Sequence, residues 1–70
     1  MHPSPIDDPR RFSDVLRDWI EARGTTAYAL GKDRTLGVSA ATLRGWMGNA
    51  PCPVERQTRA LMTLIEEGRA

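Results

Sequence analysis

Few side chains in this 70-residue sequence belong to types that carry out covalent or metal chemistry. Its one cysteine, Cys52, excludes an internal disulfide, and its one histidine, His2, excludes an ordinary zinc cluster. The sequence contains no glycine-rich phosphate loop and no Ser/His/Asp or Cys/His constellation. Glu66 and Glu67 fall in the last turn of an expected helix, not in an acid/base pair. We therefore expect no enzyme, no metal and no cofactor.

The chemistry that the sequence does offer is hydrogen bonding from one arginine. Arg44 lies in the stretch Thr35–Met47 (TLGVSAATLRGWM), among residues with almost no side chain: Ala40, Ala41 and Gly45. A guanidinium group donates in a planar fork that matches paired acceptors. Glycine within a helix costs about 1 kcal/mol relative to alanine, so its presence favours close approach of this face to something else.

Charge is distributed unevenly, although the formal net charge is only +1. Residues 23–59 hold six basic and two acidic residues, and the rest of the chain holds four basic and seven acidic residues. This asymmetry is typical of a protein that offers one basic surface to a polyanion; ordinary scatter of charge is the alternative. The basic residues of the middle segment are Arg23, Lys32, Arg34, Arg44, Arg56 and Arg59.

The first helix of the sequence has the clearest pattern. Residues 1–8 are rich in proline and lack periodicity, so we expect a flexible N-terminal arm followed by a domain over residues 9–68. Asp8 suits a helix N-cap with Pro9 at the first helical position, and Gly24 suits the helix end. The apolar residues follow helical spacing and predict one buried stripe: Phe12, Val15, Leu16, Trp19 and Ile20.

Two short helices should follow, joined by a turn that contains Gly37. Thr25 or Thr26 can cap the first, which should end near Asp33. Ser39 can cap the second, whose inward residues are Leu43, Trp46 and Met47. Pro53 can open a fourth helix that ends at Gly68 and has an apolar stripe. The predicted fold is all-α, a small four-helix domain, and the predicted stripe of the last helix is Val54, Thr58, Leu61, Met62 and Ile65.

The stretch LGVSAATLRGW resembles the turn and recognition helix of the helix-turn-helix superfamily, in the style of phage-repressor-like bacterial regulators. Gly37 matches the turn glycine, and Leu43 and Trp46 match the helix anchors. The family pattern also expects a small residue four positions before the turn glycine, preceded by an apolar one. Gly31 and Leu30 fill these roles if the turn (KDRT) is about two residues longer than usual.

The resemblance implies that the helix after Ser39 enters the major groove of double-stranded DNA, which is about 12 Å wide. The alternative is that its thin face packs against another helix. Arg56 and Arg59 of the last helix could also contact DNA phosphates. The alternative is that Arg59 pairs with Glu55, four positions earlier, and that Arg56 is only solvated. The expected base contacts are Ser39, Ala40, Ala41, Arg44 and Gly45, and the expected phosphate contacts are Thr26, Tyr28, Lys32, Arg34, Thr42, Asn49 and Arg56.

Taken together, the sequence predicts a dimeric, sequence-specific DNA-binding regulator, most often a repressor of its own promoter acting on an inverted repeat. The dimer interface is expected at Leu61, Leu64 and Ile65. The small size and the ending APCPVERQTRALMTLI are similar to those of anti-CRISPR-associated autorepressors of phages and mobile elements.

No membrane span and no leader are recognisable, so we expect a cytoplasmic protein of the bacterial nucleoid with no small-molecule effector. The alternative is a helical protein-interaction module, such as an antitoxin or adaptor.

Overall fold

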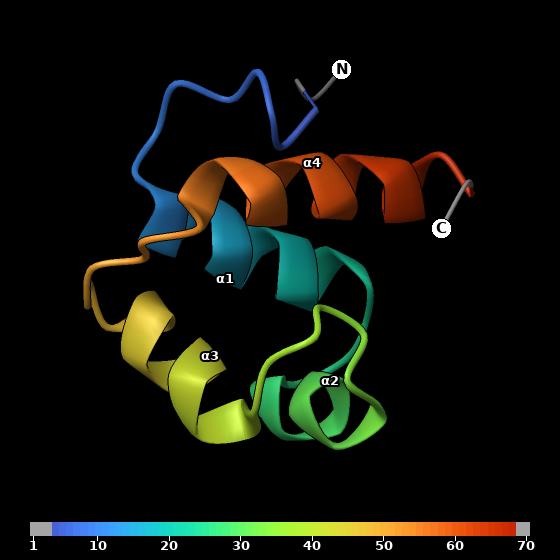
Figure 1. The fold of residues 1–70 in the computed structure, drawn as a ribbon. Coiled ribbons are helices and arrows are strands. Elements are labelled where there is room, and N and C mark those ends of the chain that lie inside the picture. Colours follow the sequence, from blue (N-terminus) through green and yellow to red (C-terminus); the bar gives the residue numbers. More distant parts are fainter. Residues whose placement is uncertain (1–3, 69–70) are drawn as a thin grey trace.

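The computed structural model describes residues 4–68, and within that range it is all-helical, with four helices and no strand. This confirms the predicted all-α four-helix fold. In Figure 1, α4 lies over α1 on one side of the molecule, and α2 and α3 lie together on the other side. The elements in chain order are α1 (Phe12–Ala22), α2 (Ala27–Asp33), α3 (Ala40–Met47) and α4 (Glu55–Glu66).

One hydrophobic core joins all four helices. Its three fully buried side chains, Leu16, Leu43 and Met62, come from α1, α3 and α4. Phe12 packs edge-on against Trp46, with 5.7 Å between the ring centroids. The whole apolar stripe predicted for the first helix is buried in this core, and the other buried apolar residues are Ala27, Leu30 and Leu36.

The predicted helix caps are present at both short helices. Thr26 Oγ1 accepts the N–H of Ala29 at 3.1 Å, and Ser39 Oγ accepts the N–H of Thr42 at 3.2 Å. Each cap satisfies a first-turn N–H group that has no partner within its helix. Gly24 follows α1 with a φ of +67°, a conformation that glycine adopts without steric cost.

Both prolines that were predicted to open helices lie before the true starts. Helix α1 begins at Phe12, because the Asp8 carboxylate accepts the backbone N–H and guanidinium of Arg10 instead of capping a helix. The hydrogen bond from the Arg10 side chain lowers the pKa of Asp8. Helix α4 begins at Glu55, because its N–H donates to the Cys52 carbonyl in a turn that contains Pro53.

Part of the predicted N-terminal arm contacts α4. The guanidinium of Arg59, which is 8% exposed, donates to the carbonyl oxygens of Pro5, Asp8 and Arg10 at 2.7, 2.8 and 2.8 Å. The N–H of Ile6 also donates to Thr63 Oγ1 at 3.1 Å. Sequence patterns do not reveal such contacts, because they join residues about 50 positions apart. The first three residues of the arm lie outside the described part of the chain.

Replacing Arg59 with methionine would keep an apolar stem but remove the donors for three carbonyl oxygens. Since unsatisfied buried acceptors are costly, we expect Arg59→Met to lower the free energy of unfolding by about 2–4 kcal/mol. Urea denaturation followed by circular dichroism measures this change. Arg56→Met, at an exposed position of the same helix, is the matched control and should stay within about 0.5 kcal/mol of the parent. Equal small effects would contradict the role assigned to Arg59.

Candidate nucleic-acid interface

Helices α2 and α3 come into backbone contact at Gly31. A Cβ atom placed at Gly31 would lie 2.2 Å from the backbone nitrogen and 2.5 Å from the Cα atom of Ala40. Only glycine therefore lets the first turn of α3 lie this close to α2. Leu30, beside it, is buried in the core. These two residues thus occupy the apolar and small positions expected for a lengthened turn.

The turn itself uses two residues in the left-handed backbone region. Arg34 ends α2 with a φ of +54°, and the N–H of Thr35 donates to the carbonyl of Leu30 at 3.1 Å. Gly37, in the same turn, has a φ of +74°, which glycine adopts without steric cost. Lys32, in the last turn of α2, and Arg34, at its C-cap, are both exposed.

Helix α3 has one buried and one exposed face. Leu43 and Trp46 are 0% and 6% exposed and fix the helix to the core, and Met47 packs against that core. Ala41 and Arg44 are exposed on the other face. The side chain of Arg44 forms no hydrogen bond or ion pair with any of residues 4–68. Its guanidinium is therefore available to bind another molecule.

The two hydroxyl groups at the start of α3 are already engaged within the chain. Ser39 Oγ accepts the N–H of Thr42 and lies 3.1 Å from Thr42 Oγ1. Both residues are exposed, so each can still touch a ligand, but their first role is to cap the helix. Among the polar residues predicted to contact DNA on this face, Arg44 is the one whose side chain has no polar atom engaged inside the described chain.

The small residues of α3 are small for different reasons. Ala40 is half-buried where its backbone meets Gly31, so it serves the contact between α2 and α3. A Cβ atom at Gly45 would meet only the Cβ atom of Ala50, at 3.7 Å, which is an ordinary contact. Packing against the described residues therefore accounts for the small size at position 40 but not for the glycine at position 45.

Residues around α3 supply further exposed donors. Thr26 is exposed, although its hydroxyl caps α2, and Tyr28 next to it is 64% exposed. The cations predicted as phosphate contacts are all exposed, and none of them is paired within residues 4–68. They are Lys32, Arg34 and Arg56.

Helix α4 contributes fewer side chains to the candidate interface than the sequence allowed. Arg59 pairs with Glu55 at 3.0 Å and is buried, which confirms the competing interpretation of that arginine. Of the residues expected at a dimer interface, Leu64 is 40% exposed, whereas Leu61 and Ile65 are half-buried against the core. Leu64 is thus the member of that set with the most surface to offer a partner.

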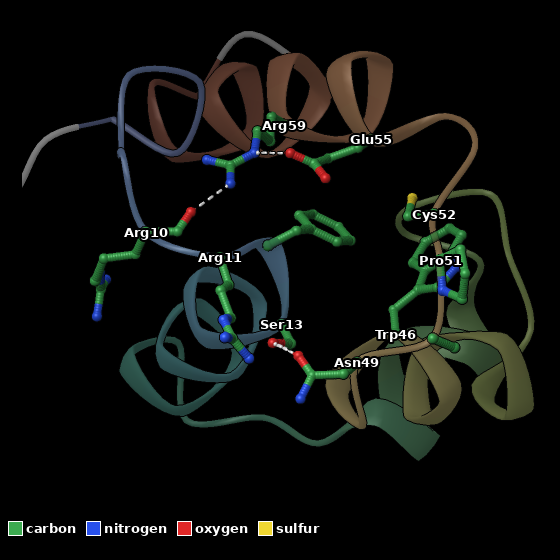
Figure 2. Close-up of a pocket in the computed structure, with 11 residues that line it drawn as sticks. Arg10, Arg11, Ser13, Trp46, Asn49, Pro51, Cys52, Glu55 and Arg59 are labelled. Atoms are coloured by element: carbon green, nitrogen blue, oxygen red, sulfur yellow. Dashed lines mark hydrogen bonds and ion pairs between the residues drawn. The ribbon is translucent and has the colours of Figure 1, made fainter.

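A cleft of about 510 Å³ lies between the start of α1 and the loop that follows α3 (Figure 2). Ser13, which is 4% exposed, donates its hydroxyl hydrogen to Asn49 Oδ1 at 2.6 Å across this cleft. Arg11 also lines the cleft, and Figure 2 shows its side chain directed toward this pair. Sequence reasoning proposed Asn49 but missed Arg11 and Ser13, because a contact between residues 36 positions apart leaves no local pattern.

Cys52 lines the same cleft and is half-buried. Burial raises the pKa of its thiol, with smaller opposing contributions from hydrogen bonds to Val54 and Thr58. Because the thiolate is the reactive form, this shift disfavours nucleophilic or redox chemistry at neutral pH.

Comparison with protein-family models, curated proteins and solved structures found no match to this chain. Among residues 4–68, no cluster of three or more His, Cys, Asp or Glu side chains has the arrangement to hold a metal ion. No helix in that range has the length and apolar character needed to cross a membrane.

Substituting Gly31 tests the contact that orients α3. We expect Gly31→Ala to lower the free energy of unfolding by about 2–3 kcal/mol, because the added methyl group overlaps the Ala40 backbone. Gly48→Ala is the control, since a Cβ there would make only an ordinary contact, 3.5 Å from the Arg44 carbonyl oxygen. Urea denaturation of both variants measures the difference. A neutral Gly31→Ala would mean that α2 and α3 are farther apart than described.

Proposed function

We propose that this chain is a sequence-specific double-stranded DNA-binding transcriptional regulator that acts as a dimer on an inverted repeat. The observation that carries the proposal is the exposed face of α3, where an unpartnered Arg44 stands among residues with little side chain. Its setting in the cell would be the bacterial nucleoid, and its simplest role is repression of its own promoter.

The dimensions of α3 support entry into a groove. A helix with its side chains is about 10–12 Å across, close to the roughly 12 Å width of the major groove. Ala41 and Gly45 shorten the distance between the helix backbone and the base edges. Arg44 would then donate two hydrogen bonds to O6 and N7 of a guanine, the commonest specific contact of arginine with DNA. Lys32 and Arg34, exposed at the turn, would bind phosphates and fix the register.

A single helix with one base-reading arginine provides limited affinity, which favours a dimer. Two copies on half-sites about 34 Å apart would combine their contacts. Leu64 and Ile6, 40% and 45% exposed, supply apolar surface for the second copy on the α4 side of the molecule. Ile6 is held on α4 by its hydrogen bond to Thr63. The protomers would then join away from the face of α3 that reads DNA.

Fluorescence anisotropy tests the proposal against its alternative, a module that binds a partner protein through the same thin face. The probes are a duplex from upstream of the gene and a random-sequence duplex, titrated over a range of salt concentrations. We expect tighter binding to the upstream duplex, with affinity that falls steeply as salt rises. No binding to either duplex at low salt would overturn DNA recognition and favour the protein-interaction module.

Arg44 should determine specificity, whereas the turn cations should determine general affinity. We expect Arg44→Ala to cost about 1–3 kcal/mol of binding free energy, concentrated at one base position per half-site. Lys32→Ala and Arg34→Ala should weaken binding to all sequences alike. Titrations against a set of single-base operator variants measure both effects. A uniform loss for Arg44→Ala would contradict base reading by this side chain.

Substitution of Gly45 should change stability and DNA affinity in opposite directions. A methyl group at this position meets only an ordinary contact with Ala50, and alanine favours the helix, so Gly45→Ala should raise the free energy of unfolding by about 0.5–1 kcal/mol. The same methyl group would stand between α3 and the base edges and should weaken specific DNA binding. Urea denaturation and anisotropy on one preparation measure the two changes. Unchanged binding by a stabilised variant would show that the thin face does not approach DNA closely at this point.

A further inference from the structure

We infer that Arg11 and the side-chain amide of Asn49 form a binding site for one phosphate of the DNA backbone, and that buried Ser13 positions the amide. The inference rests on the proposed function and deepens it, because it adds a contact made from α1 and the end of α3. The site lies in the cleft of Figure 2, where Ser13 and Asn49 are joined by a hydrogen bond.

Asn49 is held at both its backbone and its side chain. It directly follows the C-cap of α3, with a φ of +73°, and its N–H donates to the Trp46 carbonyl at 3.1 Å. Its Oδ1 accepts the hydroxyl hydrogen of Ser13 at 2.6 Å, and Ser13 is 4% exposed. The amide is therefore fixed in an orientation, although Asn49 as a residue is exposed.

The hydrogen bond from Ser13 decides which ligand the amide can take. With Oδ1 occupied by a donor, Asn49 presents its NH₂ group to solvent, so the exposed part of this amide donates. Arg11 adds a second donor with a positive charge, and it has no ion-pair partner among the residues that the structure describes. A pair of donors with one net positive charge selects a ligand with anionic acceptor oxygens, and a phosphodiester group has that chemistry.

The carboxylates near the cleft do not compete for Arg11. Glu55, which also lines the cleft, pairs with Arg59 at 3.0 Å. Asp8 pairs with Arg10 at 2.9 Å, and Asp18 pairs with the same arginine. Each of these acids is thus paired with another arginine, and none of them forms an ion pair with Arg11.

The position of the cleft places this phosphate on the path expected for DNA. Helix α3 has eight residues, which gives it a length of about 12 Å, similar to the width of the major groove. Arg34 lies in the turn before α3 and Lys32 lies in the last turn of α2, whereas Asn49 follows Gly48, the C-cap of α3. Donors at both ends of the helix can therefore contact the backbones that border the groove in which α3 lies.

The salt dependence of DNA affinity tests the contribution of Arg11. One cationic contact with a phosphate contributes about 0.9 to the slope of log K against log salt, so Arg11→Ala should lower the magnitude of the slope by about 0.9 and weaken binding about tenfold at 0.1 M salt. Arg17→Ala is the matched control, since it removes the same charge from α1, whose N-cap is Arg11, at a guanidinium already paired with Asp14. The slope of the control should stay close to that of the parent. Equal slopes for the two variants would overturn the inference.

A double-mutant cycle tests the positioning role of Ser13. Asn49→Gly, which keeps the positive φ accessible, and Ser13→Ala should each weaken DNA binding by about two- to tenfold without changing the salt slope. If Ser13 acts through Asn49, Ser13→Ala will have no further effect on DNA affinity when glycine stands at position 49. Ser13→Thr, which keeps the hydroxyl group, should restore part of the affinity lost in Ser13→Ala. Additive losses would overturn the positioning role.

Failure of this site and failure of the proposed function are distinguishable. If the parent protein binds no DNA, the proposed function fails and this site fails with it. If the parent binds and Arg44→Ala relaxes specificity, but Arg11→Ala matches its control and Asn49→Gly binds like the parent, the phosphate site alone is wrong. Circular dichroism of each variant checks that losses of affinity do not arise from unfolding.

Discussion

The close approach of α2 and α3 at Gly31 is the constraint on which the proposed interface depends. A Cβ atom at that position would overlap the backbone of Ala40, so the angle between the helices is fixed by backbone contact and not by flexible side chains. With its first turn held there and Leu43 fully buried, α3 can turn only one face outward. That face carries Arg44, and the rigidity of the contact determines where its guanidinium can reach.

Local sequence signals predicted the elements near this contact well. Thr26 and Ser39 cap their helices as expected, because a cap depends on residues three positions apart. The sequence also indicated Gly31 as the small residue before the turn. The position four residues before Gly37 is occupied by Asp33, a charged residue that does not suit a core. The two prolines misled the prediction of helix starts: a proline permits a first helical turn but does not require one, and Asp8 binds Arg10 instead.

Contacts between distant residues were the part that the sequence could not supply. Arg59 carries the same charge as Arg56 three positions earlier, yet it is buried because the carbonyl groups of residues 5, 8 and 10 surround its guanidinium. The local pattern indicates the pair of Arg59 with Glu55, four positions earlier, but it does not indicate that the guanidinium is buried. The hydrogen bond from Ser13 to Asn49 likewise joins residues far apart in the sequence, 36 positions from each other. In a chain this short, such bonds extend a small core by tying the N-terminal segment and the loop after α3 to the helices.

The central claim is that the exposed face of α3 binds DNA, and amide chemical-shift mapping of the ¹⁵N-labelled protein tests it most directly. A random-sequence duplex at low salt is sufficient, since general backbone binding does not require the operator. We expect the largest shifts across residues 39–49 and at Arg11 and Lys32, with little change in the second half of α4. Shifts confined to α4, or no shifts at low salt, would contradict it.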